Sequence, residues 1–285
     1  MSAQPQRLYT EAWSDYALLD AGNGQKLERW GGIITIRPEI NAYFKPAWAM
    51  QEWLTQAHWR FVETGKNSGD WQALKADVPQ QWQIHYQNLS FQLELTQFKH
   101  LGLFPEQRSN WDFLQQQLKP DARFLNLFAY TGAASCIARQ SGAETLHVDS
   151  VKALITWANT NQQLNGLTDI KWVHEDALKF VERELKRQRQ YDAILMDPPA
   201  WGLGAKGEKW KLEQKLERLI ANVQLLLKPQ AVLIVNTYSP SVQLTDLKQL
   251  ARTYFGDKQT EVGELWMKST TNKDLYYGNV LRVWS

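Results

Sequence analysis

The segment RFLNLFAYTGAASCIARQ, residues 123–140, opens a repeating pattern of strands and helices in this 285-residue chain. Residues 123–128 are mostly apolar, which predicts a strand buried on both faces. Gly132 opens an amphipathic stretch, which predicts a helix over residues 132–140. A buried strand that leads directly into a helix is the first half of a β–α–β unit.

The same pattern continues toward the C-terminus. Four more strands are predicted, at residues 144–149 (ETLHVD), 170–174, 191–197 (YDAILMD) and 231–237 (AVLIVNT). Each precedes an amphipathic stretch, and these predict helices at residues 151–164, 177–187, 211–227 and 241–254. Residues 260–267 and 279–284 are two further strands with no helix between them, so the last strand is expected to run antiparallel. The pattern predicts an α/β fold with a doubly wound, Rossmann-like sheet of seven strands.

The first hundred residues have a different pattern. Asn23-Gly24 separates two short strand-like stretches, and this dipeptide is typical of a two-residue hairpin turn. A short strand at residues 33–36 follows, and a second hairpin is predicted over residues 81–97. We therefore expect a small strand-rich domain at residues 1–104 and the α/β domain at residues 105–285.

The composition narrows the class of protein. Hydrophobic residues make up 44% and charged residues 22%, the balance of a globular protein. The chain has 32 Lys and Arg against 30 Asp and Glu, a net charge of +2. This low charge argues against binding to nucleic acid by overall charge alone, so RNA would bind through a local patch or through a partner. The single Cys136 excludes an intramolecular disulfide, and neither it nor the five histidines have metal-binding spacing. Without a signal sequence or an apolar run of membrane length, we expect a cytoplasmic protein with no metal and no membrane partner.

Polar residues follow the predicted strands at the edge where such sheets bind ligands. Asp149 ends the second strand, Asp176 follows the third and Asp197 ends the fourth. An acid in the place of Asp149 can accept hydrogen bonds from both hydroxyls of a ribose. Gly132, at a helix N-terminus that favours an anion, would let a ligand approach the backbone. Asp176 would either accept a hydrogen bond from an adenine amine or cap its helix.

Two common phosphate-binding loops are absent. The segment around Gly132 lacks the three glycines of GxGxxG, and the segment around Gly204 lacks the Walker spacing. A cofactor that joins a nucleoside to a small zwitterion, such as S-adenosylmethionine, fits the polar residues at these strand ends better than a dinucleotide does.

Several segments resemble the motifs of class I S-adenosylmethionine-dependent methyltransferases. They are FLNLFAYTGAAS (124–135), LHVDSVKALITWANTNQQLNGL (146–167), HEDA (174–177) and AILMDPPAWG (193–202). The chain is most similar to the bacterial large-subunit rRNA methyltransferases, whose first motif is LN-x-F-x-YTG. LGLFPEQR (101–108) resembles their G-x-x-x-DQR segment, with Glu106 where they have Asp. The first hundred residues do not match the PUA RNA-binding domain of the fuller relatives. The resemblance implies a methyltransferase domain over residues 105–285 and an RNA substrate.

The resemblance also implies which residues hold S-adenosylmethionine. Residues 130–132 would surround the methionine part, Asp149 the ribose, and Asp176 with Ala177 the adenine, while Arg108 would pair with a carboxylate. The cofactor-binding set that it implies is Arg108, Asn126, Phe128, Ala129, Tyr130, Thr131, Gly132, Asp149, Ser150, Asp176, Ala177 and Asp197.

Asp197-Pro198-Pro199 resembles the (D/N)-P-P-aromatic motif of amino methyltransferases. In that motif the acid or amide and a following carbonyl accept hydrogen bonds from a planar amine, and the aromatic ring stacks on the base. Here the ring comes one residue later, at Trp201, so the implied catalytic set is Asp197, Pro198, Pro199 and Trp201. Lys206 and Lys209 would meet substrate phosphate at the mouth of the site or form a solvated face.

Three functions remain open from the sequence. Methylation of a pyrimidine carbon normally needs a cysteine nucleophile, and Cys136 lies among apolar residues of a predicted helix, which favours a nitrogen or oxygen acceptor. The first function is therefore methylation of an RNA base, in rRNA. The second is methylation of a small molecule or a protein, which the weak net charge favours. The third is a non-catalytic RNA-binding module that retains a cofactor-shaped pocket.

Overall fold

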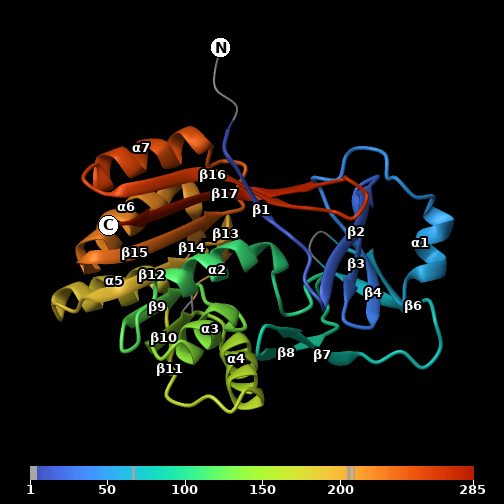
Figure 1. Cartoon of the computed structure of the whole chain (residues 1–285), viewed down its shortest axis with the longest axis horizontal. Helices are drawn as coiled ribbons and strands as arrows, with labels where there is room; N and C mark the ends of the chain where they lie inside the picture. The colour runs from blue at the N-terminus through green and yellow to red at the C-terminus, as the bar shows by residue number, and fades with distance from the viewer. Residues whose placement is uncertain (1–4, 66–67, 204–206, 208) are drawn as a thin grey trace. The chain divides into compact units, whose positions relative to one another are not determined.

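A computed structural model describes residues 5–65, 68–203, 207 and 209–285 (Figure 1). The chain divides into two compact units. The larger unit contains Arg108–Leu265 and Gly278–Ser285 together with the N-terminal residues up to Leu8. The smaller unit contains Tyr9–Gln107 and Trp266–Tyr277, so it includes the end of one C-terminal strand and the start of the next.

The larger unit is built on a sheet of eight strands in the order β1-β16-β17-β15-β12-β9-β10-β11. Five parallel neighbours form its centre: β9 (Arg123–Leu127), β10 (Glu144–Asp149), β11 (Lys171–His174), β12 (Tyr191–Met196) and β15 (Leu227–Thr237). The last strand, β17 (Leu275–Trp284), pairs antiparallel with β15. The predicted Rossmann-like sheet is confirmed.

The predicted number of seven strands is one short. β1 (Arg7–Thr10) adds an eighth strand beside β16 (Gln259–Met267), at the edge of the sheet. Its four residues are too few to show a period-2 pattern, and nothing adjacent in the sequence pairs with them. Such a strand is positioned by its tertiary partner, so its sequence alone does not identify it.

Six helices cover this sheet in two layers, visible in Figure 1. One layer contains α5 (Ala177–Lys186), α6 (Leu212–Leu226) and α7 (Leu244–Phe255), and the other contains α2 (Arg108–Gln117), α3 (Ala133–Gln140) and α4 (Lys152–Leu164). The core between sheet and helices is apolar; Leu127, Ile194 and Leu233 of the strands are fully buried with Leu219 of α6. Burial of both sheet faces explains why the central strands have nearly continuous apolar sequences.

The smaller unit contains a five-stranded sheet, one helix and a hairpin. The sheet strands are β2 (Tyr16–Gly22), β3 (Gln25–Trp30), β4 (Ile33–Pro38), β5 (Trp59–Glu63) and β6 (Gly69–Ala73). The helix is α1 (Met50–Gln56), and the hairpin joins β7 (Gln81–Tyr86) to β8 (Leu89–Glu94). Both hairpins expected from the sequence are present, and Asn23 and Gly24 have the positive φ values, 52° and 75°, of a primed turn. β5, β6 and α1 were not expected from the sequence.

A buried ion-pair network lies within the smaller unit. Arg37 donates to both carboxylate oxygens of Glu28, at 2.7 and 2.8 Å, and neither side chain is more than 4% exposed. Lys26 lies 3.6 Å from Glu28 and 3.3 Å from Glu39, and its ammonium donates to the Tyr277 hydroxyl at 2.7 Å. Burial raises the pKa of Glu28, but the charges of Arg37 and Lys26 outweigh burial, so the pKa lies below its usual value.

Glu106 lies in the short 3₁₀ turn Pro105–Gln107, and the pKa of its carboxyl shifts in the opposite direction to that of Glu28. Its side chain is buried, and burial raises its pKa from 4.5 to about 7, a rise that Lys26 and Arg37 only partly oppose. The folded state therefore favours the neutral acid. The stability that this carboxyl contributes is complete below pH 4.5 and is lost as the pH rises through about 7.

The Glu106→Gln variant tests this assignment. Because glutamine is neutral at every pH, the variant should gain stability relative to the native chain between pH 4.5 and about pH 8, by about 3 kcal/mol at the upper end. Urea unfolding at several pH values measures the difference. Glu213→Gln, on the exposed face of α6, is the matched control for removal of one carboxylate. A stability difference that stays constant across this range would contradict the assignment.

Candidate functional site

The loop after β9 has an unusual backbone. Phe128 and Tyr130 have φ values of 55° and 52°, and Gly132 has a φ of 83°, so alternate residues of the loop are left-handed. Side chains other than glycine adopt this conformation rarely, at a cost of about 1–3 kcal/mol each. Such conformations persist where neighbouring structure holds them, and they gather at ligand sites.

Gly132 has a structural role in addition to the close approach of a ligand, which stays a prediction. Its φ of 83° favours glycine, and a Cβ on this residue would lie 2.9 Å from the Cβ of Ala158 in α4. The missing side chain thus lets α3 and α4 pack closely. Sequence reasoning had assigned the glycine to close approach of a ligand.

Asp149 anchors that loop from the end of β10. Its Oδ2 accepts a hydrogen bond from the backbone N–H of Tyr130, and its Oδ1 accepts one from that of Val151, both at 2.9 Å. The residue is only 8% exposed. Burial raises the pKa of Asp149, and these N–H donors together with that of Ser150 oppose the rise.

Asp176 is the N-cap of α5. Its Oδ1 accepts a hydrogen bond from the backbone N–H of Lys179 at 3.0 Å, so the capping role considered from the sequence is present. The residue is only 7% exposed and also lines the pocket described below. The contact with adenine stays a prediction.

The segment after β12 brings a second ring to the site. β13 (Trp201–Leu203) and β14 (Lys209–Lys211) pair antiparallel, which returns Trp210 toward the prolines. Trp210 is buried, donates its Nε1 hydrogen to the Pro199 carbonyl at 2.6 Å, and packs on Phe128 with ring centroids 4.9 Å apart. Trp201, the ring singled out from the sequence, is 59% exposed and does not line the pocket.

Asp197 stands at the end of β12, half-buried beside the end of β15. The Asn236 side-chain amide lies 3.4 Å from Asp197 Oδ1 and donates to it. Asn236 is 1% exposed, and its own Oδ1 has no hydrogen-bond partner within the described part of the chain. A buried acceptor without a partner is costly, so this amide oxygen is a candidate to receive a donor from a bound molecule.

One open pocket, whose space of about 340 Å³ includes open solvent, is lined by some of these residues. Six residues predicted from the sequence line it: Phe128, Asp149, Ser150, Asp176, Ala177 and Pro199. Four more lining residues were not predicted: Val148, Glu175, Gly202 and Trp210. The lining therefore combines acidic groups with apolar and aromatic groups, which suits a nucleoside with a polar sugar and a flat base.

Other predicted residues have different surroundings. Arg108, the first residue of α2, lies 3.4 Å from Asp112. Thr131 is buried, and its carbonyl accepts a hydrogen bond from Asn161 of α4. Lys209 is exposed in β14, and its carbonyl accepts a hydrogen bond from Lys215. Ala129 donates its N–H to the Val148 carbonyl. Lys206 lies outside the described residues.

Asn126 belongs to a buried network. Its amide donates to Ser135 Oγ at 2.9 Å, and Ser135 Oγ lies 3.0 Å from Nδ1 of His147. All three residues are at most 2% exposed, and burial lowers the pKa of His147 to about 3, so the imidazole is neutral. The network joins β9, α3 and β10 beneath the strained loop. Asn126 does not line the pocket, and its predicted contact with the cofactor stays a prediction.

The described residues form neither a metal site nor a membrane-spanning helix. They contain no group of three or more His, Cys, Asp or Glu side chains placed to hold a metal ion. None of the helices formed by these residues is both long enough and apolar enough to cross a bilayer.

Fold and pocket together define the Rossmann-like methyltransferase architecture, with the donor pocket at the carboxyl ends of the parallel strands. A family model described as S-adenosylmethionine-dependent methyltransferase matches residues 39–253. That match covers well over half of the chain, and the chain therefore belongs to this family. S-adenosylmethionine is the family's cofactor, and the acidic and aromatic lining of the pocket fits it.

Named relatives support the same family. A ribosomal RNA large subunit methyltransferase K/L from Syntrophotalea carbinolica is 35% identical over 177 residues, which are 59% of this chain and 24% of that protein. The protein of the same name from Pseudoalteromonas translucida is 33% identical over 148 residues, 50% of this chain and 20% of that one. The chain thus spans about a quarter or less of the length of these curated relatives.

Solved structures extend the similarity to the whole chain. A SAM dependent methyltransferase from Agrobacterium tumefaciens superposes with a TM-score of 0.93 at 33% identity, and the match covers 99% of this chain and 94% of that one. A chain solved in complex with SAH shares the fold, with a TM-score of 0.76 at 18% identity over 95% of this chain and 76% of that one.

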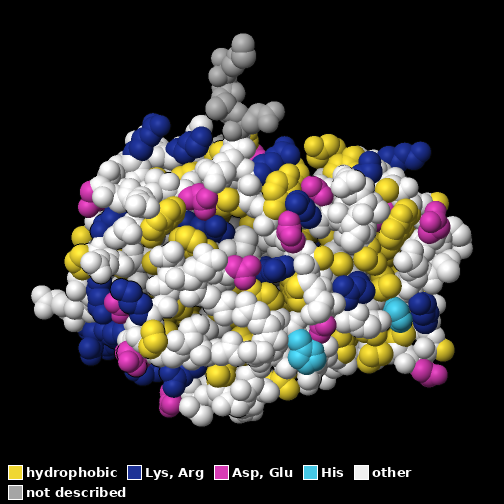
Figure 2. All heavy atoms as spheres, viewed as in Figure 1, with side chains coloured by type: hydrophobic (Ala, Val, Ile, Leu, Met, Phe, Trp, Pro, Cys, Tyr) yellow, Lys and Arg dark blue, Asp and Glu magenta, His cyan; other side chains and the backbone are white. Residues whose placement is uncertain are grey.

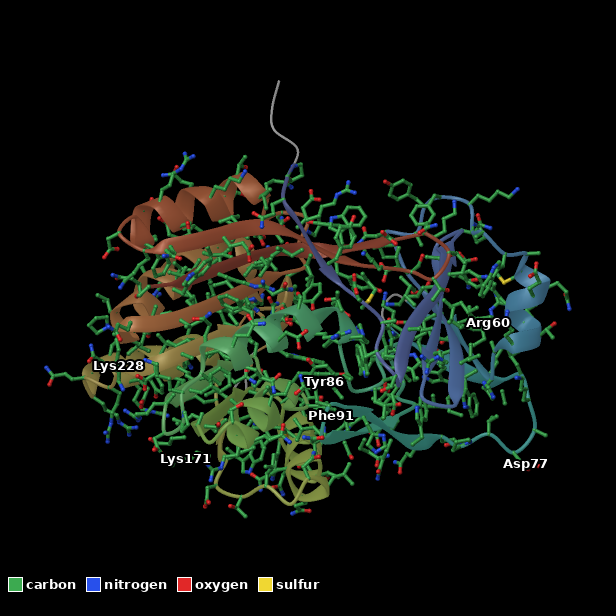
Figure 3. All side chains as sticks on the ribbon, viewed as in Figure 1. Arg60, Asp77, Tyr86, Phe91, Lys171 and Lys228 are labelled. Atoms are coloured by element: carbon green, nitrogen blue, oxygen red, sulfur yellow. The ribbon has the colours of Figure 1, made fainter. Side chains whose placement is uncertain are left out.

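Asp149→Asn tests the proposed ribose contact. Asparagine keeps one acceptor oxygen but replaces the other with a donor, so affinity for S-adenosylmethionine should fall about ten- to a hundredfold. Titration calorimetry measures the affinity. Asp192→Asn is the matched control, because Asp192 lies at the opposite end of the parallel strands, 2.7 Å from Lys228, a residue labelled in Figure 3. Equal affinity in Asp149→Asn and the native chain would exclude this contact.

Proposed function

We propose that this chain transfers a methyl group from S-adenosylmethionine to a nitrogen or oxygen of an RNA base, in ribosomal RNA. We assign the chemistry to residues 105–285 and expect it to take place in the cytoplasm. The observation that carries the proposal is a pair of oxygen acceptors at two adjacent strand ends. Asp197 follows β12, two residues before Pro199 of the pocket lining, and Asn236 donates to it from the end of β15.

S-adenosylmethionine, when bound, supplies a methyl group that its sulfonium sulfur has already activated. The chain must then orient the acceptor and take up its proton, and positioning accounts for most of the rate enhancement. We assign Asp197 to accept a hydrogen bond from the N–H of a planar amine. This hydrogen bond fixes the orientation of the amine. Asp197 also takes up the amine proton as the methyl carbon leaves the sulfonium sulfur and bonds to the amine nitrogen.

The carbonyl that assists Asp197 is that of Pro198. Trp210 donates to the Pro199 carbonyl at 2.6 Å, and Pro198 is buried beside Asp197. The Pro198 carbonyl is therefore the main-chain acceptor that we assign to the substrate amine. We assign to Trp210 the stacking role that the sequence suggested for Trp201, because its ring lines the pocket.

Cys136 supports a nitrogen or oxygen acceptor over a pyrimidine carbon. The thiol is fully buried within α3, and burial raises its pKa to about 12. A thiol in this environment is not ionised near neutral pH and has no path to a base, so it does not supply the nucleophile that carbon methylation needs.

The choice of ribosomal RNA rests on the relatives. Two proteins that are 33% and 35% identical to the matching part of this chain carry the name ribosomal RNA large subunit methyltransferase K/L. Because the matching part is about a quarter or less of those proteins, the substrate is assigned here by similarity of the methyltransferase region alone. A base within a duplex would have to be flipped out to reach the pocket.

Substitutions at Asp197 test the proposed function. Asp197→Ala removes the acceptor and should lower methyl transfer to large-subunit rRNA about a hundredfold or more. Asp197→Asn keeps one acceptor oxygen and should retain intermediate activity. Transfer of tritiated methyl to rRNA from cells that lack the protein measures the rates, with Asp192→Asn as the control. Native-like rates in Asp197→Ala would exclude the assigned role, and label found only in protein or metabolite fractions would exclude RNA as substrate.

A further inference from the structure

The loop between β4 and α1 exposes large hydrophobic side chains in the smaller unit. Tyr43 is 87% exposed and Ile40 is 86% exposed, more than any other large hydrophobic side chain in the described part of the chain. Figure 2 shows hydrophobic side chains over this loop with Lys or Arg side chains beside them. Such exposure contributes nothing to folding, and where it belongs to a larger patch it is typical of a surface that binds another molecule.

The loop is held firmly although its tip is exposed. Asp20 is fully buried and accepts hydrogen bonds from the backbone N–H of Ala47 and of Trp48, at 3.2 and 2.8 Å. Asn23 and Gly24, in the β2–β3 turn, donate to the Phe44 and Ala42 carbonyls at 2.8 and 2.7 Å. A ring on a loop fixed in this way loses little conformational entropy when it binds a partner.

Half-buried rings of the same unit continue the surface. Trp266 of β16 lies with its ring centroid 6.5 Å from that of Tyr9 and 5.8 Å from that of Tyr276. Asn41, in the β4–α1 loop, donates to the Tyr276 carbonyl at 2.8 Å, so the loop and this row of rings are adjacent. The ring of Phe44 packs edge-to-face with the exposed ring of Tyr43, with the ring centroids 5.8 Å apart.

Lysines lie among these rings. Lys273 is 5.8 Å above the ring of Phe44, Lys268 is 5.4 Å above that of Tyr9, and Lys45 is exposed next to Phe44. Lys268 also pairs with Glu11 at 2.9 Å. Lys45 and Lys273 have no ion-pair partner among the described residues, so their charges are available to a bound anion.

We propose that this aromatic–lysine surface binds an unpaired segment of RNA. It consists of Tyr9, Ile40, Tyr43, Phe44, Trp266 and Tyr276 with Lys45, Lys268 and Lys273. Bases stack on Tyr43 and the neighbouring rings, and Lys45 and Lys273 contact the phosphates. Lysines that lie over and beside these rings place positive charge next to stacking surfaces, and an unpaired strand presents phosphates next to free bases, so this complementarity favours RNA over a protein partner. This inference rests on the proposed function, because the binding surface and the methylation site would both act on RNA.

Binding of a labelled single-stranded oligouridylate to the full chain, followed by fluorescence anisotropy without S-adenosylmethionine, tests the proposal. Tyr43→Ala should weaken binding by about five- to a hundredfold, whereas Tyr43→Phe keeps the ring and should bind within about twofold of the native chain. The double variant Lys45→Ala, Lys273→Ala should reduce the slope of log affinity against log salt by about 1.4, the value for two phosphate contacts on a single strand.

Matched controls come from the larger unit. Leu225→Ala removes an apolar side chain that is 61% exposed on α6, and Lys248→Ala removes an exposed lysine from α7; neither should alter RNA binding. Thermal unfolding and affinity for S-adenosylmethionine establish that each variant is folded.

The outcomes separate this proposal from the proposed function. RNA binding that depends on Tyr43, in a chain that methylates no RNA, would support the surface and refute the function. The proposed RNA-binding surface would be overturned if Tyr43→Ala bound RNA with native affinity, or if the native chain bound no RNA. It would also be overturned if Tyr43→Phe bound RNA as weakly as Tyr43→Ala. Cross-links from position 43 to a ribosomal protein instead of RNA would also overturn it.

Discussion

One buried carboxylate, that of Asp149, fixes the two loops on which the pocket depends. It accepts the N–H of Tyr130 from the loop after β9 and that of Val151 at the start of α4. A carboxylate out of water is costly unless fixed donors replace the lost hydration, and here the backbone provides them. The left-handed conformations of Phe128 and Tyr130 can persist because this anchor holds the loop in place.

The order of strands explains why this anchor lies at a ligand site. β9, β10, β11 and β12 are parallel neighbours, so their carboxyl ends share one edge of the sheet, and the acids that follow β10 and β11, Asp149 and Asp176, line the same pocket. Charges at the amino ends of the strands are paired instead: Lys171 with Glu144, and Lys228 with Asp192, with both lysines labelled in Figure 3. At the amino ends the acids thus pair with lysines, whereas at the carboxyl ends Asp149 and Asp176 accept backbone N–H groups and also line the pocket.

The sequence predicted what depends on local pattern and missed what depends on distant contacts. Alternating apolar runs identified the central strands and the acids at their ends. β1 is a four-residue strand whose partner, β16, is remote in sequence, so no local periodicity identified it. Trp210 was missed because a chain reversal, and not a fixed spacing from Asp197, brings its ring to Pro199. Asn126 was assigned to the cofactor by resemblance, and that contact stays a prediction; its hydrogen bond to Ser135 could not be predicted, because it joins two elements through side chains.

The smaller unit uses the same physical device as the larger one. Asp20 is buried and accepts backbone N–H groups from the β4–α1 loop, just as Asp149 does from the loop after β9. A loop held by apolar packing must bury its side chains, which then cannot face a partner. A loop held through its backbone by a buried carboxylate can turn its side chains outward and remain ordered. Tyr43 can therefore be both rigidly placed and 87% exposed, and this combination is what stacking on an unpaired base requires.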